Sequence, residues 1–124
     1  MGHISVEGKL TGPLGTRRVR FLVDTGATMT RIPAELADAL GIVATGRRRF
    51  QLADDRLVER PVGEVWIEIL GQGGTTPVSI GPRGQRAILG VLTLEILWLE
   101  VDPVHHRLKA MEFGLMLEDV AGHA

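Results

Sequence analysis

Apolar and polar residues alternate along several short stretches of the chain, which is the pattern of half-buried β-strands. In the clearest of them, Val62 to Leu70, every second residue is a β-branched apolar residue from Val65 to Ile69. Similar stretches, some of them wholly apolar, predict further strands at His3 to Leu10, Arg17 to Val23, Thr75 to Ile80 and Ala87 to Leu89. Clusters of glycine, proline and threonine separate them and predict turns at Thr11 to Thr16, Gly71 to Gly74 and Gly81 to Gly84.

Two segments change to a helical period. Pro33 to Leu40 has proline at its start and is followed by Gly41, which suits the position after a helix. Val91 to Trp98 is the second helix candidate, and it can turn Leu94, Leu97 and Trp98 toward the core.

After the second helix candidate, Leu99 to Val101 and Arg107 to Met111 predict a closing hairpin with a turn near Asp102. We therefore expect a mostly β fold with one or two short helices.

Length and composition limit the possible functions. The 124 residues suit one domain, which we expect to span residues 1–124, with a core at about 3–111 and a tail at 112–124. The chain has no cysteine, which excludes a disulfide scaffold, a thiolate metal site and a cysteine nucleophile. The net charge is −1, and we see neither a signal peptide nor an apolar stretch that could cross a membrane. We expect a cytoplasmic protein that binds neither nucleic acid nor membrane.

Four other features have ordinary interpretations. Arg47 to Arg49 predicts a solvated strand edge or loop. His105 and His106 are adjacent, so with Asp102 they indicate a turn more readily than a metal site, and we predict no metal. Trp66 and Trp98 are interpreted as core or interface anchors. The remaining feature is the apolar tail Leu115-Met116-Leu117, which either covers a partner chain or frays.

The segment with the strongest chemical signal is Phe21-Leu22-Val23-Asp24-Thr25-Gly26-Ala27. It carries an apolar strand directly into an aspartate, although carboxylates avoid interiors unless they are hydrogen-bonded or functional. Gly26 allows close approach of the backbone and leaves its N–H free to point at the Asp24 carboxylate. By itself this tripeptide is equally compatible with a plain turn after a strand.

A second segment, Ala87-Ile88-Leu89-Gly90, lies about sixty residues further on and leads into the second helix candidate. Together the two segments resemble the retroviral-type, or retropepsin-like, aspartic proteases, especially their small bacterial and archaeal members. The resemblance covers most of the chain, from about Val6 to Val101. It implies a closed, single-lobed β-barrel that dimerises.

The resemblance also implies roles for the residues of the first motif. Asp24 would be the catalytic aspartate, one from each chain, and the two would meet on the two-fold axis and activate a water without metal or cofactor. Thr25 would reach across the axis to its twin, and Gly26 would hold the carboxylate and contact the substrate. Ala27 would pack beneath the site.

Further residues of this sequence match substrate-facing parts of the family. Ile88 would line the pocket, with Leu89 and Gly90 supporting it, and Pro82 lies where the family has a substrate-facing loop. The matching hairpin flap here is Phe50 to Val58. We expect its tip, Ala53-Asp54-Asp55-Arg56, to cover an extended peptide substrate.

The sequence departs from viral members in three ways. The flap tip is charged and has no glycine. Thr28 and Val91 stand where viral members have an aspartate and an arginine, so both ends of that ion pair are absent together. The chain also continues to Ala124, so the dimer sheet is predicted to differ and to use the Leu99 to Met111 hairpin.

We therefore expect a homodimeric aspartic endopeptidase acting on a peptide or protein. The alternative is a binding or scaffolding domain that keeps the fold but has little activity. A third interpretation is a monomeric barrel that binds a ligand.

Overall fold

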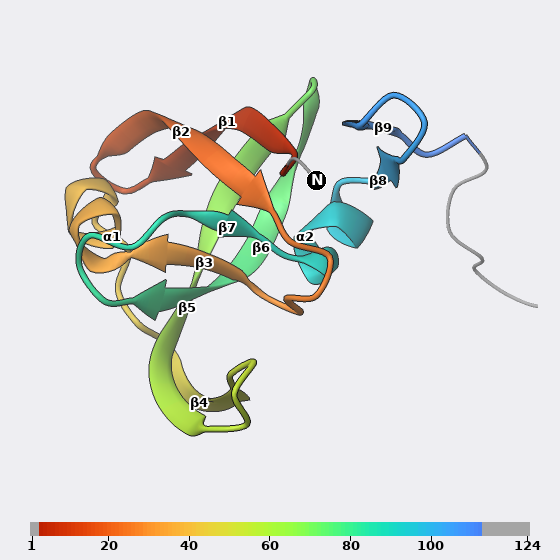
Figure 1. Cartoon of the computed structure of the whole chain (residues 1–124). Helices are drawn as coiled ribbons and strands as arrows, with labels where there is room; N and C mark the ends of the chain where they lie inside the picture. The colour runs from red at the N-terminus through yellow and green to blue at the C-terminus, as the bar shows by residue number, and fades with distance from the viewer. Residues whose placement is uncertain (1–2, 113–124) are drawn as a thin grey trace, which may run out of the picture.

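The computed structural model describes residues 3–112, and within them the chain forms a seven-stranded mixed sheet that closes on itself. The strands of the closed ring, in the order in which they pair, are β1 (Ser5–Gly12), β2 (Gly15–Val23), β7 (Ile88–Leu89), β3 (Thr30–Pro33), β6 (Gln72–Gly81) and β5 (Leu57–Ile69). The ring closes where Lys9 to Thr11 of β1 pair with Trp66 to Glu68 of β5. The expected mostly β fold and closed barrel are confirmed (Figure 1).

The remaining strand of this sheet, β4 (Gly46–Gln51), pairs only with β5 and lies outside the ring. With the first part of β5 it makes a hairpin that projects from the barrel (Figure 1). The predicted hairpin at Phe50 to Val58 is confirmed, and its arms extend well beyond those limits. Arg47 to Arg49 lie exposed on this edge strand, as the solvated-edge interpretation predicted.

The core fills the ring with apolar side chains from every part of it. Its fully buried members include Leu10, Phe21, Ile32, Leu40, Ile67 and Leu89. The alternation predicted for β5 is confirmed, because Val65, Ile67 and Ile69 are buried while Trp66 is 48% exposed. Trp66 is therefore not a core residue, which leaves the interface interpretation open for it.

Two short helices lie within residues 3–112, α1 (Ala34–Leu40) and α2 (Val91–Ile96). Helix α1 ends at Gly41, whose φ of 72° is left-handed, as expected for a glycine after a helix. Pro33 was expected inside the helix but ends β3, and β3 itself was not predicted. None of the helices in the described part of the chain is long and apolar enough to span a membrane.

The second helix ends earlier than the sequence predicts. Leu94 and Leu97 are buried as expected, but Trp98 has a left-handed φ of 57° and turns the chain toward the next strand. Trp98 is 45% exposed, so its predicted place in the core is wrong.

Smaller differences concern turns. The turns after β1 and β5 are tighter than predicted, because β1 continues to Gly12 and β6 begins at Gln72 instead of Thr75. Leu70 and Gly71 both adopt positive φ, which suits a two-residue hairpin turn between β5 and β6.

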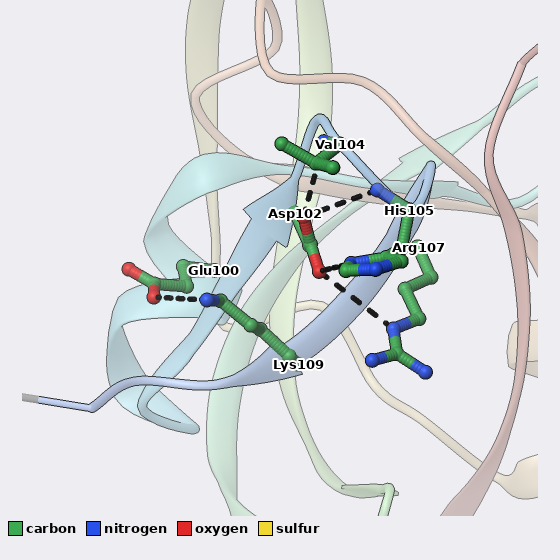
Figure 2. Close-up of polar contacts among 6 residues, drawn as sticks. All are labelled: Glu100, Asp102, Val104, His105, Arg107 and Lys109. Atoms are coloured by element: carbon green, nitrogen blue, oxygen red, sulfur yellow. Dashed lines mark hydrogen bonds and ion pairs between the residues drawn. The ribbon is translucent and has the colours of Figure 1, made fainter.

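The closing hairpin is confirmed as β8 (Leu99–Asp102) and β9 (Arg107–Ala110), which form a separate two-stranded sheet. Its turn is organised by the buried carboxylate of Asp102 (Figure 2). Asp102 Oδ1 accepts hydrogen bonds from the backbone N–H groups of Val104 and His105 at 3.1 and 3.2 Å. Its Oδ2 accepts one from His105 Nδ1 at 2.8 Å.

The interpretation of Asp102 and the histidines as a turn is therefore confirmed. In residues 3–112 no group of three or more His, Asp or Glu side chains is placed to hold a metal ion. The apolar tail Leu115-Met116-Leu117 lies outside the described residues.

The hairpin turn yields a prediction about stability and pH. The side-chain and backbone hydrogen bonds from His105 lower the pKa of Asp102 from 3.8 to about 2. A carboxyl group whose pKa is lower in the folded state stabilises that state above its unfolded pKa, and this contribution is lost as pH falls toward the folded value. We expect Asp102→Asn to lower the Tm at neutral pH, with the difference from wild type shrinking between about pH 4 and pH 2.

Thermal unfolding followed by circular dichroism across this pH range measures the effect. Glu100→Gln is the matched control, because Glu100 lies on the same hairpin and only approaches Lys109 at 3.7 Å (Figure 2). A Tm difference for Asp102→Asn that did not change with pH would contradict the prediction.

Candidate active site

Asp24 lies immediately after β2, where the chain turns out of the barrel. Its backbone N–H donates to the carbonyl of Leu89 on the neighbouring strand β7 at 3.0 Å. Its Oδ1 accepts from the backbone N–H of Gly26 at 2.9 Å, as the sequence predicted, and its carbonyl accepts from Ala27 N at 3.0 Å. The carboxylate is thus held in one orientation by its own loop while the residue remains exposed to solvent.

The loop after Asp24 is fastened to the start of helix α2. The first N–H groups of a helix have no partner within the helix and need acceptors from elsewhere. Here the carbonyl of Ala27 accepts from Val91 N and that of Thr28 accepts from Leu92 N, both at 2.9 Å. The segments that contain Thr28 and Val91, the residues that stand where viral members have an ion pair, are therefore joined by backbone hydrogen bonds.

Gly90 is required by close packing. A Cβ atom at this position would lie 2.6 Å from the carbonyl carbon of Met29 and 2.9 Å from the backbone nitrogen of Thr30. These neighbours are backbone atoms of the segment that links the Asp24 loop to β3, so they cannot move aside as a flexible side chain would. The glycine of the second motif thus lets β7 and α2 pass directly against the active-site segment.

Three buried threonines connect this crossing to the rest of the barrel. Thr30, Thr76 and Thr93 come from β3, β6 and α2, and all are fully buried. The Thr93 hydroxyl lies 2.6 Å from that of Thr30 and 2.7 Å from that of Thr76. Thr30 Oγ1 also accepts from the backbone N–H of Gly90 at 3.0 Å. The network satisfies buried polar groups and fixes Gly90 relative to β3.

A cavity of about 1010 Å³ lies between the Asp24 loop and the β4–β5 hairpin. It includes several predicted site residues in its lining, namely Asp24, Gly26, Ala27, Ala53, Asp55, Arg56 and Ile88. Leu89 is buried behind Ile88, in keeping with its predicted supporting role. The structure thus brings the first motif, the second motif and the predicted flap around one space.

Apart from the supporting residues Leu89 and Gly90, three predicted residues do not line the cavity. Pro82 is exposed, and its loop contributes Gln85 instead. Thr25 is exposed at the turn of the loop. Its hydroxyl group forms no hydrogen bond within residues 3–112, which suits its expected contact with a second chain.

Asp54, the third, is occupied in the hairpin turn. Its Oδ1 accepts from Arg56 N at 3.1 Å, and its Oδ2 lies 2.7 Å from Arg56 Nε. Asp55 adopts a left-handed φ of 68°, a conformation that aspartate tolerates. The Asp54-Asp55 pair therefore builds the glycine-free tip that the sequence predicted to be a turn.

Other residues that line the cavity were not predicted from the sequence, chiefly Met29, Arg31, Arg60 and Ser79. Arg31 and Ser79 are directly paired across β3 and β6, and Arg31 also pairs with Ile88 on β7. Because β3 has only four residues, its alternation is too short to show which side chain faces inward. Only the pairing of distant strands identifies this part of the site.

One prediction concerns the close approach at Gly90. We expect Gly90→Ala to lower the free energy of unfolding by about 1–3 kcal/mol, since an added methyl group overpacks against backbone. Chemical denaturation with urea measures it. Gly46→Ala is the control, because a Cβ there meets nothing closer than 3.5 Å. Equal stability of the two variants would show that the crossing has room to spare.

A second prediction concerns the threonine network. Thr93→Val keeps the shape of the side chain but leaves two buried hydroxyl groups short of a partner, so we expect a loss of about 1–3 kcal/mol. Thr11→Val serves as the control, because the hydroxyl pair of Thr11 and Thr16 is exposed. The network would be energetically unimportant if both variants unfolded at the same urea concentration.

The family model described as "Aspartyl protease" matches residues 6–95. The matched region contains both motifs, the hairpin over the cavity and nearly all of α2.

Proposed function

We propose that this chain, which belongs to the aspartyl protease family, hydrolyses peptide bonds as a homodimer in which each chain supplies one Asp24. The observation that carries the proposal is the half-complete site. The cavity floor holds a single exposed carboxylate, Asp24, among the described residues. The other carboxylate in the lining, Asp55, belongs to the overlying hairpin and accepts a hydrogen bond from Gln51 at 3.1 Å.

A two-fold axis beside Asp24 would complete the site. Isologous dimers bring the same residue of both chains together at the axis. Two carboxylates about 3 Å apart cannot both ionise, so such a pair shares one proton. The exposed position of Asp24 and Thr25 leaves them free to meet a second copy.

The proposed reaction uses a water held between the two carboxylates. The ionised carboxylate takes a proton from the water, whose oxygen attacks the peptide carbonyl carbon. The protonated carboxyl group donates a hydrogen bond to the oxygen that becomes negatively charged. The carbon–nitrogen bond then breaks, and the leaving nitrogen receives a proton from the dyad, which returns to its starting state.

The hairpin and the cavity suit an extended peptide. The β4 edge and the Asp24 loop face each other across the cavity, and a peptide can pair with backbone groups as an added strand. Phe50, Leu52 and Ile88 offer apolar surface for its side chains. Gly26 supports the carboxylate on the floor through the 2.9 Å hydrogen bond.

The main test replaces the aspartate without changing its size. Asp24→Asn should abolish cleavage of a mixed-sequence peptide library, detected by mass spectrometry, because an amide cannot take a proton from water. Asp38→Asn is the control, since Asp38 lies on α1, does not line the cavity and has its carboxylate paired with Arg83. Equal cleavage by wild type and Asp24→Asn would contradict the proposal. No cleavage by either would favour the binding or scaffolding domain.

Mixing experiments test the shared site. When wild-type and Asp24→Asn chains exchange at equal amounts, mixed dimers have only one aspartate, so activity per wild-type chain should fall to about half. A monomeric enzyme would keep its full activity per wild-type chain, and a sedimentation measurement would then show a single chain.

A further inference from the structure

The cavity carries more positive than negative charge. Its lining among the described residues includes the guanidinium groups of Arg31, Arg49, Arg56 and Arg60 and the carboxylates of Asp24 and Asp55. Arg56 is paired with Asp54 at 2.7 Å. The other arginines of the lining form no ion pair within 4.0 Å among residues 3–112. This excess of unpaired cations needs an explanation in a cavity that is meant to receive a ligand.

Arg31 holds a central place on the cavity wall. It lies in a row of directly paired residues, Ile88, Arg31, Ser79 and Val62, that crosses β7, β3, β6 and β5. Arg60 lies two residues before Val62 on β5 and therefore on the same face of the sheet. The two arginines thus share the wall next to the Asp24 loop.

The hydrogen-bonding capacity of Arg31 is incompletely used. Its Nη2 donates to the carbonyl of Arg86 at 2.9 Å, which orients the guanidinium group. Its Nε is buried and has no hydrogen-bond partner. A buried donor of a charged group without an acceptor is costly, and a negative charge close to the guanidinium group offsets part of that cost.

The surroundings of Arg31 also favour an anion. Burial lowers the pKa of Arg31, the charge of Arg60 lowers it further, and Asp24 raises it. Two guanidinium groups that repel each other in a partly dehydrated wall are stabilised by a negative charge placed between them.

We propose that Arg31 and Arg60 form a subsite that binds a carboxylate group of the substrate beside Asp24. This inference rests on the proposed proteolytic function and names its substrate class: peptides with an Asp or Glu side chain, or a free C-terminal carboxylate, close to the cleaved bond. Guanidinium groups bind carboxylates through paired, charge-assisted hydrogen bonds, and among residues 3–112 the Arg31 guanidinium makes a single hydrogen bond, from Nη2 to Arg86.

The test compares mixed-sequence peptides that differ only by Glu against Gln, or Asp against Asn, at one position. At one position relative to the cleaved bond, we expect wild type to cleave the acidic peptide with a kcat/KM about tenfold higher than that of its neutral counterpart. Each peptide is made with a free and an amidated C-terminus. Faster cleavage of the Glu or Asp peptide than of its amide counterpart assigns the subsite to a side chain, and faster cleavage of the free than of the amidated form of the same peptide assigns it to the C-terminal carboxylate.

Variants identify the residues responsible. Arg31→Gln and Arg60→Gln should each lower the ratio of kcat/KM for acidic peptides to kcat/KM for neutral ones. Arg47→Gln is the matched control. Arg47 lies on the β4–β5 hairpin, as Arg60 does, but it pairs with Glu59 at 2.7 Å and does not line the cavity. Because Arg31 also holds the backbone of Arg86, Arg60→Gln decides the question if Arg31→Gln does not fold.

Binding separates the failure of this inference from that of the proposed function. Asp24→Asn protein is titrated with the same peptides, labelled for fluorescence anisotropy. If wild type cleaves acidic and neutral peptides equally and free and amidated peptides equally, or if Arg60→Gln keeps the full preference, the subsite is overturned while proteolysis stands. If wild type cleaves neither but the Asp24→Asn protein binds the acidic peptide more tightly, the subsite stands and proteolysis fails. Equal binding with no cleavage overturns both.

Discussion

The crossing of Gly90 over the backbone of Met29 and Thr30 is the constraint on which the rest of the site depends. There is no room for a side chain between these two segments. Because they touch, the carbonyls of the Asp24 loop can cap α2, Thr30 can accept from Gly90, and Leu89 can fix the backbone of Asp24. The absence of a side chain at Gly90 therefore allows a set of hydrogen bonds that positions Asp24, sixty-six residues earlier in the sequence.

The polar groups of the molecule divide into those that are satisfied internally and those that are left for a partner. The buried threonines and Asp102 have all their hydrogen bonds within the fold and serve its stability. Asp24 and Arg31 are different, because one is exposed on a fixed loop and the other has a buried donor without an acceptor. Both residues line the same cavity, so these two groups with unused hydrogen-bonding capacity lie together at the proposed site.

Much of this arrangement can be predicted from the sequence where the signal is local. Asp24 and Gly90 stand in short apolar segments whose chemistry is visible without any partner strand, and Asp54 marks a turn by its own side chain. Arg31 could not be predicted, because its place on the cavity wall depends on pairing with strands that begin more than forty residues later. Trp98 was misplaced for a related reason: its left-handed backbone, not the helical period, decides its exposure.

The β4–β5 hairpin lies outside the closed ring, since β4 pairs with β5 alone. Changes in its length or charge therefore alter the roof of the cavity without breaking a hydrogen bond of the barrel. The tip of this hairpin can therefore be replaced while the floor that holds Asp24 keeps its hydrogen bonds. The cavity is in this sense modular: its roof, with Asp54 and Asp55 at the tip, is free to vary, while its floor is held by the hydrogen bonds of the barrel.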